Sequence, residues 1–201
     1  MSSKGNIVIG VTGSIGSGKS TVSGFFQKWG GVLIDADSLA HEFIATPEIV
    51  SAVKNQYGAE IMDGSGNVWR TKLGAVVFRN RNSLKKYYNI IKEPLIKIFC
   101  KRLEEAKLSH KIVVFDAPLL FEWKLEEFVN TVVTINADRE LCIKRASDRS
   151  SLSRSEIEDR MTLQLEPNIK RSRADYFIKN DGGIDDLREC AKVVWSSIQA
   201  N

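Results

Sequence analysis

Cysteine and long apolar runs are both scarce in this sequence, and each shortage excludes a class of protein. The 201 residues include only three cysteines, Cys100, Cys142 and Cys190. Because their number is odd and their spacing is wide, they fit neither a disulfide framework nor a metal-binding motif, and they favour a reducing cytoplasm. The first apolar run, residues 7–11, is too short for a secretory signal or a membrane span. We therefore expect a cytoplasmic protein with no membrane partner.

A strong charge of either sign is also missing. The 29 Lys and Arg residues against 25 Asp and Glu give a formal net charge of +4. This excess suits an anionic ligand, but it is too small and too scattered to require nucleic acid, so no nucleic-acid partner is expected. Internal repeats are absent, and a hydrophobic fraction of 43% is enough for a sizeable core. The length predicts one large domain, or one core with smaller excursions.

Five short apolar runs predict buried strands. They cover residues 7–11, 32–34, 112–115, 131–135 and 176–178. Because the runs are apolar without alternation, they are typical of a parallel sheet that is covered on both faces. Helical patterns lie between them at 20–29 and 138–148, and a last one runs from 184 to 198. The sequence therefore predicts an α/β fold with a five-stranded parallel sheet flanked by helices.

Two intervals interrupt this alternation of strands and helices. Residues 37–108 contain no convincing strand, but they show helical patterns at 38–45, 48–57, 71–78 and 83–108, the last of which Pro94 would kink or divide. Residues 149–173 are charged, and Ser153 with Glu156 forms a capping box there. We therefore expect a core of 1–36, 109–148 and 174–201, a helical subdomain of 37–108, and a lid of 149–173.

The most informative motif is a phosphate loop. Residues 13–20 read Gly-Ser-Ile-Gly-Ser-Gly-Lys-Ser and match G-x-x-x-x-G-K-[ST] at every fixed position. Glycines let the backbone curl so that successive N–H groups point at phosphate oxygens, and the helix that follows adds its N-terminal dipole. Lys19 would reach the β- and γ-phosphates, and the Ser20 hydroxyl would bind Mg²⁺. The nucleotide-binding residues that we expect are Thr12, Gly13, Gly16, Ser17, Gly18, Lys19, Ser20 and Thr21.

This loop identifies a nucleoside triphosphate as donor but leaves the acceptor open. Kinases, GTPases, motor ATPases and transport ATPases all carry it. A GTPase would normally show an Asn-Lys-x-Asp guanine-binding motif, which this sequence lacks. We therefore expect ATP and Mg²⁺ as cofactors.

Two aspartates near predicted strand ends are candidates for the chemistry. Asp37 follows the run 32–34, and carboxyl ends of strands face the ligand crevice in open α/β sheets. Asp37 could accept a proton from the acceptor hydroxyl or hold Mg²⁺ through water, or it could only cap the next helix. Asp116 closes the run 112–115 like the acidic residue of a Walker-B strand. Asp116 could contact Mg²⁺, or it could only start a turn.

Arginines follow in the helix at 138–148 and in the charged segment. Arg145 and Arg149 are four residues apart and share one helix face. A mobile arginine can stabilise the charge that develops on a transferred phosphoryl group. The alternative is an ordinary solvated helix face.

Several segments resemble the dephospho-CoA kinase family, in that family's order and over nearly the whole chain. The most diagnostic are Asp35-Ala36-Asp37 and Pro118-Leu119-Leu120-Phe121-Glu122. Further landmarks are the segment 12–21, Asp63-Gly64, Leu73-Gly74, Val77-Phe78, Arg145, Arg149, Arg160 with Gln164, and the segment 174–182.

The resemblance implies a P-loop kinase fold with a helical CoA-binding insertion at 37–108 and a lid at 149–173. It implies ATP-dependent phosphorylation of the ribose 3′-hydroxyl of dephospho-CoA, which gives CoA and ADP in the final step of coenzyme A biosynthesis. It also matches Asp37 to the family's proposed base, and Arg145 and Arg149 to its lid and nucleotide contacts. The expected catalytic residues are therefore Asp37, Lys19, Arg145 and Arg149, and the expected metal ligands are Ser20, Asp37 and Asp116.

Two residues depart from the family's pattern. Glu93 precedes Pro94 where the family usually has His, and Cys142 stands where it often has Gln. Two other functions stay open: a different small-molecule P-loop kinase, and an ATP-dependent binding or switch module. Among the possible oligomeric states, a monomer is favoured.

Overall fold

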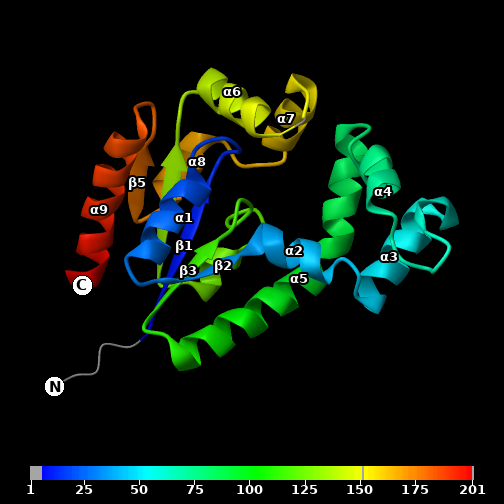
Figure 1. The fold of residues 1–201 in the computed structure, drawn as a ribbon, viewed down its shortest axis with the longest axis horizontal. Coiled ribbons are helices and arrows are strands. Elements are labelled where there is room, and N and C mark those ends of the chain that lie inside the picture. Colours follow the sequence, from blue (N-terminus) through cyan, green and yellow to red (C-terminus); the bar gives the residue numbers. More distant parts are fainter. Residues whose placement is uncertain (1–5, 151, 201) are drawn as a thin grey trace. The chain divides into compact units, whose positions relative to one another are not determined.

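The computed structural model, which describes residues 6–150 and 152–200, contains a parallel sheet (Figure 1). Its five strands lie in the order β2-β3-β1-β4-β5, and every neighbouring pair is parallel. The predicted α/β fold is thereby confirmed. The strands are β1 (Ile7–Gly13), β2 (Val32–Asp35), β3 (Ile112–Asp116), β4 (Thr131–Asn136) and β5 (Tyr176–Lys179).

The strand register brings the ends of β1 and β3 together. Val11 pairs with Asp116, and the N–H of Ala117 donates to the carbonyl of Val11 over 2.9 Å. On the other side of β1, Gly13 pairs with Ile135 of β4. The segment after Gly13 therefore begins between β3 and β4, at the carboxyl edge where ligands of open α/β sheets bind.

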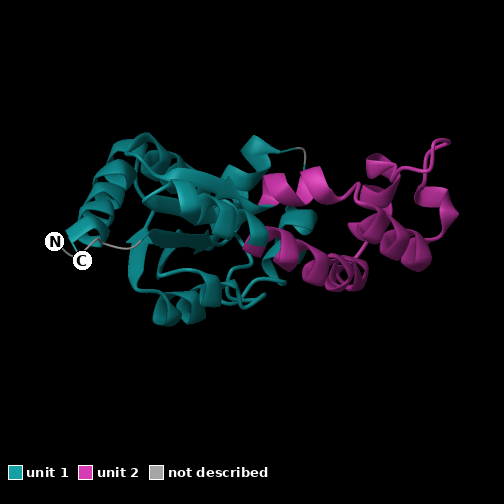
Figure 2. Cartoon of the chain, turned by 90° about the horizontal axis from the view of Figure 1, so that it is seen from below, with its two compact units in different colours: residues 1–36, 101–201 teal, residues 37–100 magenta. Residues whose placement is uncertain are grey.

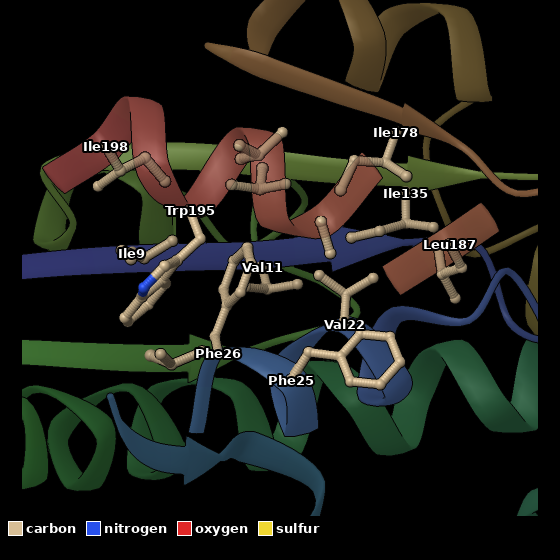
Figure 3. Packing of buried hydrophobic residues seen from close by; sticks show 14 residues of the cluster. Ile9, Val11, Val22, Phe25, Phe26, Ile135, Ile178, Leu187, Trp195 and Ile198 are labelled. Carbon is tan, nitrogen blue, oxygen red and sulfur yellow. The ribbon is translucent and has the colours of Figure 1, made fainter. Parts of the chain in front are cut away.

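Two helices, α1 (Lys19–Lys28) and α9 (Ile184–Ala200), supply one hydrophobic layer of the core (Figure 3). The apolar positions of α9 recur every three or four residues, which gives one buried face. Phe26 of α1 and Trp195 of α9 lie with their ring centroids 5.1 Å apart, and Ile9 and Val11 of β1 belong to the same cluster. Burying each such side chain contributes about 1.5–3 kcal/mol to the free energy of folding. This layer therefore holds α1 firmly on the sheet.

Three more helices of the predicted core and lid segments follow β4. They are α6 (Arg139–Arg149), α7 (Arg154–Met161) and α8 (Pro167–Arg173), and a 3₁₀ turn, η2 (Leu125–Phe128), precedes β4. The side chain of Asp138 caps α6 by accepting from the N–H groups of Glu140 and Leu141. The capping box predicted at Ser153 and Glu156 is confirmed at the start of α7.

The chain divides into two compact units (Figure 2). The first unit contains the residues up to Ala36 and from Lys101 onward, and the second unit contains 37–100. The second unit includes most of α2 (Ala36–Phe43), α3 (Pro47–Tyr57), η1 (Ala59–Ile61), α4 (Arg70–Val77) and most of α5 (Arg81–Ser109). Pro94 lies inside α5 and does not divide it. No helix within 6–150 and 152–200 is long and apolar enough to cross a membrane.

Candidate active site

The phosphate loop connects β1 to α1, and its glycines leave no room for a side chain. Gly16 and Gly18 have φ angles of +77° and +96°, in the left-handed region that favours glycine. A Cβ atom on Gly16 would lie 2.0 Å from the backbone carbonyl oxygen of Cys142 in α6. A Cβ atom on Gly18 would lie 2.3 Å from Nδ2 of Asn180. The loop is thus closely packed between α6 and the segment that follows β5.

Replacing Gly16 by alanine is expected to lower the free energy of unfolding by about 2 kcal/mol or more and to abolish ATP binding, because strain and a backbone clash coincide there. Gly24 is the matched control, since it lies in α1 with nothing within 4 Å of its Cβ direction. Gly24→Ala should raise the free energy of unfolding by about 0.5–1 kcal/mol. Urea unfolding and ATP titration measure both effects. A Gly16→Ala protein with unchanged stability and ATP affinity would contradict the expectation.

Lys19 and Asp116 form a buried ion pair at the end of the loop. The ammonium of Lys19, at the start of α1, donates to the carboxylate of Asp116, the last residue of β3. Their side chains are 11% and 1% exposed. A buried ionisable group stays charged when a partner of opposite charge lies beside it. The pair therefore keeps an ammonium and a carboxylate next to the phosphate loop. Asp116 ends a strand and pairs with Lys19, so the alternative that it only starts a turn is wrong.

The first turn of α1 suits an anion. Gly18 is its N-cap residue, and neither a side-chain cap nor an acidic first-turn residue is found in this fully described helix. The start of a helix presents backbone N–H groups to a ligand, and the helix dipole favours a negative charge there. The Ser20 hydroxyl lies in this turn, on an exposed residue.

Ser20 and Asp116 are suitable ligands for Mg²⁺. Both offer hard oxygen atoms, which this cation prefers. Across 6–150 and 152–200, no three His, Cys, Asp or Glu side chains are grouped so that they could hold a metal by themselves. The residues present therefore fit a cation that takes its other ligands from substrate phosphates and water, as Mg²⁺ usually does.

Arg145 is held against the segment that follows β5. Its guanidinium donates to the carbonyl oxygens of Asn180 and Gly182 over 2.8 and 3.2 Å. Asn180 is buried, and its side-chain amide donates to the carbonyl oxygen of Ser17 over 2.7 Å. Arg145 is thus linked to the phosphate loop through Asn180. Arg149, the last residue of α6, is exposed.

Comparisons with known proteins decide the family. The family model described as dephospho-CoA kinase matches residues 7–186. A dephospho-CoA kinase from Fusobacterium nucleatum is 34% identical over 90% of this chain and 93% of its own. A crystal structure from Thermus thermophilus has a TM-score of 0.76 and 31% identity, and covers 97% of this chain and 99% of that one. A dephospho-CoA kinase structure from Campylobacter jejuni has a TM-score of 0.67 and 27% identity, over 95% and 96% of the two chains.

The chain belongs to the dephospho-CoA kinase family. The activity of this family is the ATP-dependent phosphorylation of dephospho-CoA, the final step of coenzyme A biosynthesis, and the sequence-based prediction of this activity is confirmed. The predicted class of enzyme, a phosphotransferase with a P-loop kinase fold, is confirmed as well.

One departure from the pattern of dephospho-CoA kinases lies at the phosphate loop. Cys142 is buried, and its thiol donates to the carbonyl oxygen of Ala137 over 3.7 Å. Burial raises the pKa of this thiol, so Cys142 acts as a small apolar residue in the core. Its backbone carbonyl, which any residue would offer, is the group that contacts Gly16.

Asp37, the base expected from the dephospho-CoA kinase pattern, lies in the first turn of α2. Because α2 begins at Ala36, Asp37 does not cap it, and that alternative is wrong. Asp37 is exposed and comes two residues after Asp35, the end of β2. It belongs to the second unit, whereas the phosphate loop, Lys19 and Asp116 belong to the first.

Several residues around the phosphate loop of this dephospho-CoA kinase family member have contacts that the sequence alone did not predict. Gln164 and Asn180 were only landmarks of the resemblance, yet both bind the loop directly. Lys170 belongs to a charged segment that suggested a solvated surface, but the structure buries it to 1% exposure. A charged side chain is buried only where a partner exists, and the sequence does not show which partner Lys170 has.

Proposed function

We propose that this protein transfers the γ-phosphoryl group of ATP to the ribose 3′-hydroxyl of dephospho-CoA, with Asp37 as the base. The buried Lys19–Asp116 ion pair is the observation that supports ATP as the phosphoryl donor. The pair lies beside the glycine-rich phosphate loop, which packs against Cys142 and Asn180. Family membership supports the choice of acceptor.

The phosphates of ATP would be held by backbone N–H groups of residues 13–21 and by the first turn of α1. Lys19 would balance negative charge on the β- and γ-phosphates. Such fixed donors stabilise charge without reorganising during the reaction, so most of the rate enhancement would come from positioning and electrostatics.

Ser20 and Asp116 would hold Mg²⁺, and Asp37 is a further candidate ligand. Mg²⁺ held by these residues would supply positive charge that reduces the repulsion between the phosphates and the incoming hydroxyl.

Asp37 would orient the 3′-hydroxyl and accept its proton. We assign the helical segment 37–108 to dephospho-CoA and the segment 149–173 to a lid. Arg145 and Arg149 would contact the nucleotide from α6. Glu93 stands where the family usually has His, so an acceptor contact through that His is not part of the mechanism. The three free cysteines fit a reducing cytoplasm, and neither nucleic acid nor a membrane takes part.

A panel of acceptors tests this function. With ATP and Mg²⁺, ADP release is expected with dephospho-CoA and not with nucleosides, nucleoside monophosphates or shikimate. The product should carry the new phosphate at the ribose 3′ position, as ³¹P NMR can show. Equal turnover with a nucleoside monophosphate would instead indicate another small-molecule kinase. Salt-sensitive nucleic-acid binding without turnover of any acceptor would indicate a switch module.

A further inference from the structure

The side chain of Gln164, in the segment between α7 and α8, contacts the phosphate loop. Oε1 of Gln164 accepts the backbone N–H of Ile15 over 3.0 Å. Nε2 of Gln164 donates to the carbonyl oxygens of Gly13 and Pro118 over 3.4 and 3.3 Å. A primary amide is a flat group with an acceptor on one side and donors on the other. Gln164 therefore binds an N–H and a C=O group of the same loop simultaneously.

The carbonyl of Pro118 joins this contact to the strand that carries Asp116. It accepts from Nζ of Lys170 over 2.8 Å and from Oγ1 of Thr12 over 3.4 Å, in addition to Gln164. Thr12 directly precedes the phosphate loop, and Pro118 is two residues after Asp116. Side chains from β1, from the α7–α8 connection and from α8 thus meet at one backbone oxygen.

A buried ion pair keeps the α7–α8 connection in place. Nζ of Lys170 lies 2.9 Å from Oε1 of Glu122, and their side chains are 1% and 10% exposed. The same oxygen of Glu122 accepts the backbone N–H of Leu165, the neighbour of Gln164, over 2.6 Å. Burial lowers the pKa of Lys170, and the carboxylate of Glu122 opposes that change. The position of Gln164 is therefore set by buried, paired groups and not by an exposed loop.

We propose that Gln164 is a positioning residue which holds the phosphate loop in its nucleotide-binding conformation, with the Lys170–Glu122 pair as its anchor. Ordering each residue of a glycine-rich loop costs entropy, so a loop that is shaped before ATP arrives binds it more tightly. Gln164 ties the loop at Gly13 and Ile15, near its start, and Asn180 ties it at Ser17. The proposal rests on the phosphate loop binding ATP, but not on the identity of the acceptor.

The first experiment compares Gln164→Met with Gln27→Met. Methionine has nearly the length of glutamine but cannot bind Ile15 or Gly13. Gln27 is an exposed glutamine near the end of α1, so the same change there leaves the loop untouched. ATP affinity, measured by titration, should fall about tenfold in Gln164→Met and stay unchanged in Gln27→Met. The KM for ATP should rise while the KM for dephospho-CoA stays constant. Unchanged ATP affinity in a folded Gln164→Met protein, or an equal loss in both variants, would overturn the proposal.

A second variant tests the role of Gln164 by the pH dependence of ATP affinity, which would not change if this side chain only supported the fold. Protonated glutamic acid has the shape of glutamine and one of its donors, whereas the carboxylate has none. In Gln164→Glu, the ratio of its ATP affinity to that of the wild type should therefore be highest at the lowest pH at which the protein stays folded. The ratio should fall as pH rises and the carboxyl, whose ordinary pKa is about 4.3, loses its proton. A ratio that is independent of pH would overturn the proposal.

A third measurement needs no variant and no substrate. In the nucleotide-free protein, the N–H of Ile15 should exchange slowly with deuterium, because Gln164 covers it. Exchange as fast as that of an exposed amide would overturn the proposal. Since neither this measurement nor ATP titration uses dephospho-CoA, an incorrect acceptor assignment would leave both tests intact.

Discussion

Replacing Lys19 by methionine is expected to lower kcat by about a thousandfold or more, on the scale of lost transition-state donors. Lys19 is the cation that the structure places beside the phosphate loop, and methionine keeps its length without its charge. Turnover is measured as ADP release with saturating ATP, Mg²⁺ and dephospho-CoA. The control is Lys28→Met, which removes an exposed lysine from the other end of α1 and should leave turnover unchanged. Near-normal rates in Lys19→Met would refute the mechanism.

The same substitution should also destabilise the fold, and this effect can be separated from the catalytic one. Without Lys19, the carboxylate of Asp116 is buried and unpaired, which typically costs about 3–5 kcal/mol. Adding Asp116→Asn removes the unpaired charge, so the double variant should recover much of that loss in urea unfolding. It should not recover turnover. If activity returned together with stability, Lys19 would be a structural residue only.

Asp37→Asn should have the second large effect, a fall in kcat of about 10²–10⁴-fold, which is the range for removing a general base. The amide has nearly the same shape but cannot accept the proton. Because a general base acts on the acceptor hydroxyl and not on the nucleotide, the Kd for ATP should stay unchanged if Asp37 has this role. Steady-state kinetics with both substrates and a separate ATP titration measure these quantities.

Glu127→Gln, at an exposed carboxylate of η2, is the matched control for Asp37→Asn and should behave as the wild type. A rise in the KM for dephospho-CoA with unchanged kcat would make Asp37 a binding residue. A weaker affinity for ATP would instead make it a ligand of the nucleotide or its cation.

The strands and the phosphate loop could be predicted because their signals are local. A buried parallel strand needs a short apolar run, and each of the five runs became a strand with one or two residues added at its end. The loop motif is contiguous, since residues 13–20 alone supply the amides and the lysine. Helix starts were less accurate: α2 begins at Ala36, before Asp37, because Asp also favours the first turn of a helix.

The side chains that bind the phosphate loop from other segments could not be predicted, because their contacts join residues that lie far apart in the sequence. Gln164 reaches Ile15 across 149 positions, and Asn180 reaches Ser17 across 163. Periodicity carries no information on such pairs. Lys170 gave a misleading signal: its neighbours Arg171, Ser172 and Arg173 are exposed, so only the fold shows that this one cation is buried against Glu122.

The strand order has a consequence for how the chain folds during its synthesis. β1 and β2 follow each other in the sequence but are not neighbours, since β3 lies between them. The partners of Ile9 are Val114 and Thr131, more than a hundred residues further along. A nascent chain that has left the ribosome only as far as residue 100 therefore contains two strands with unsatisfied edges, while the helices of the second unit need only local contacts. Chaperones should bind the N-terminal strands until β3 emerges between them, and the second edge of β1 stays open until β4 follows.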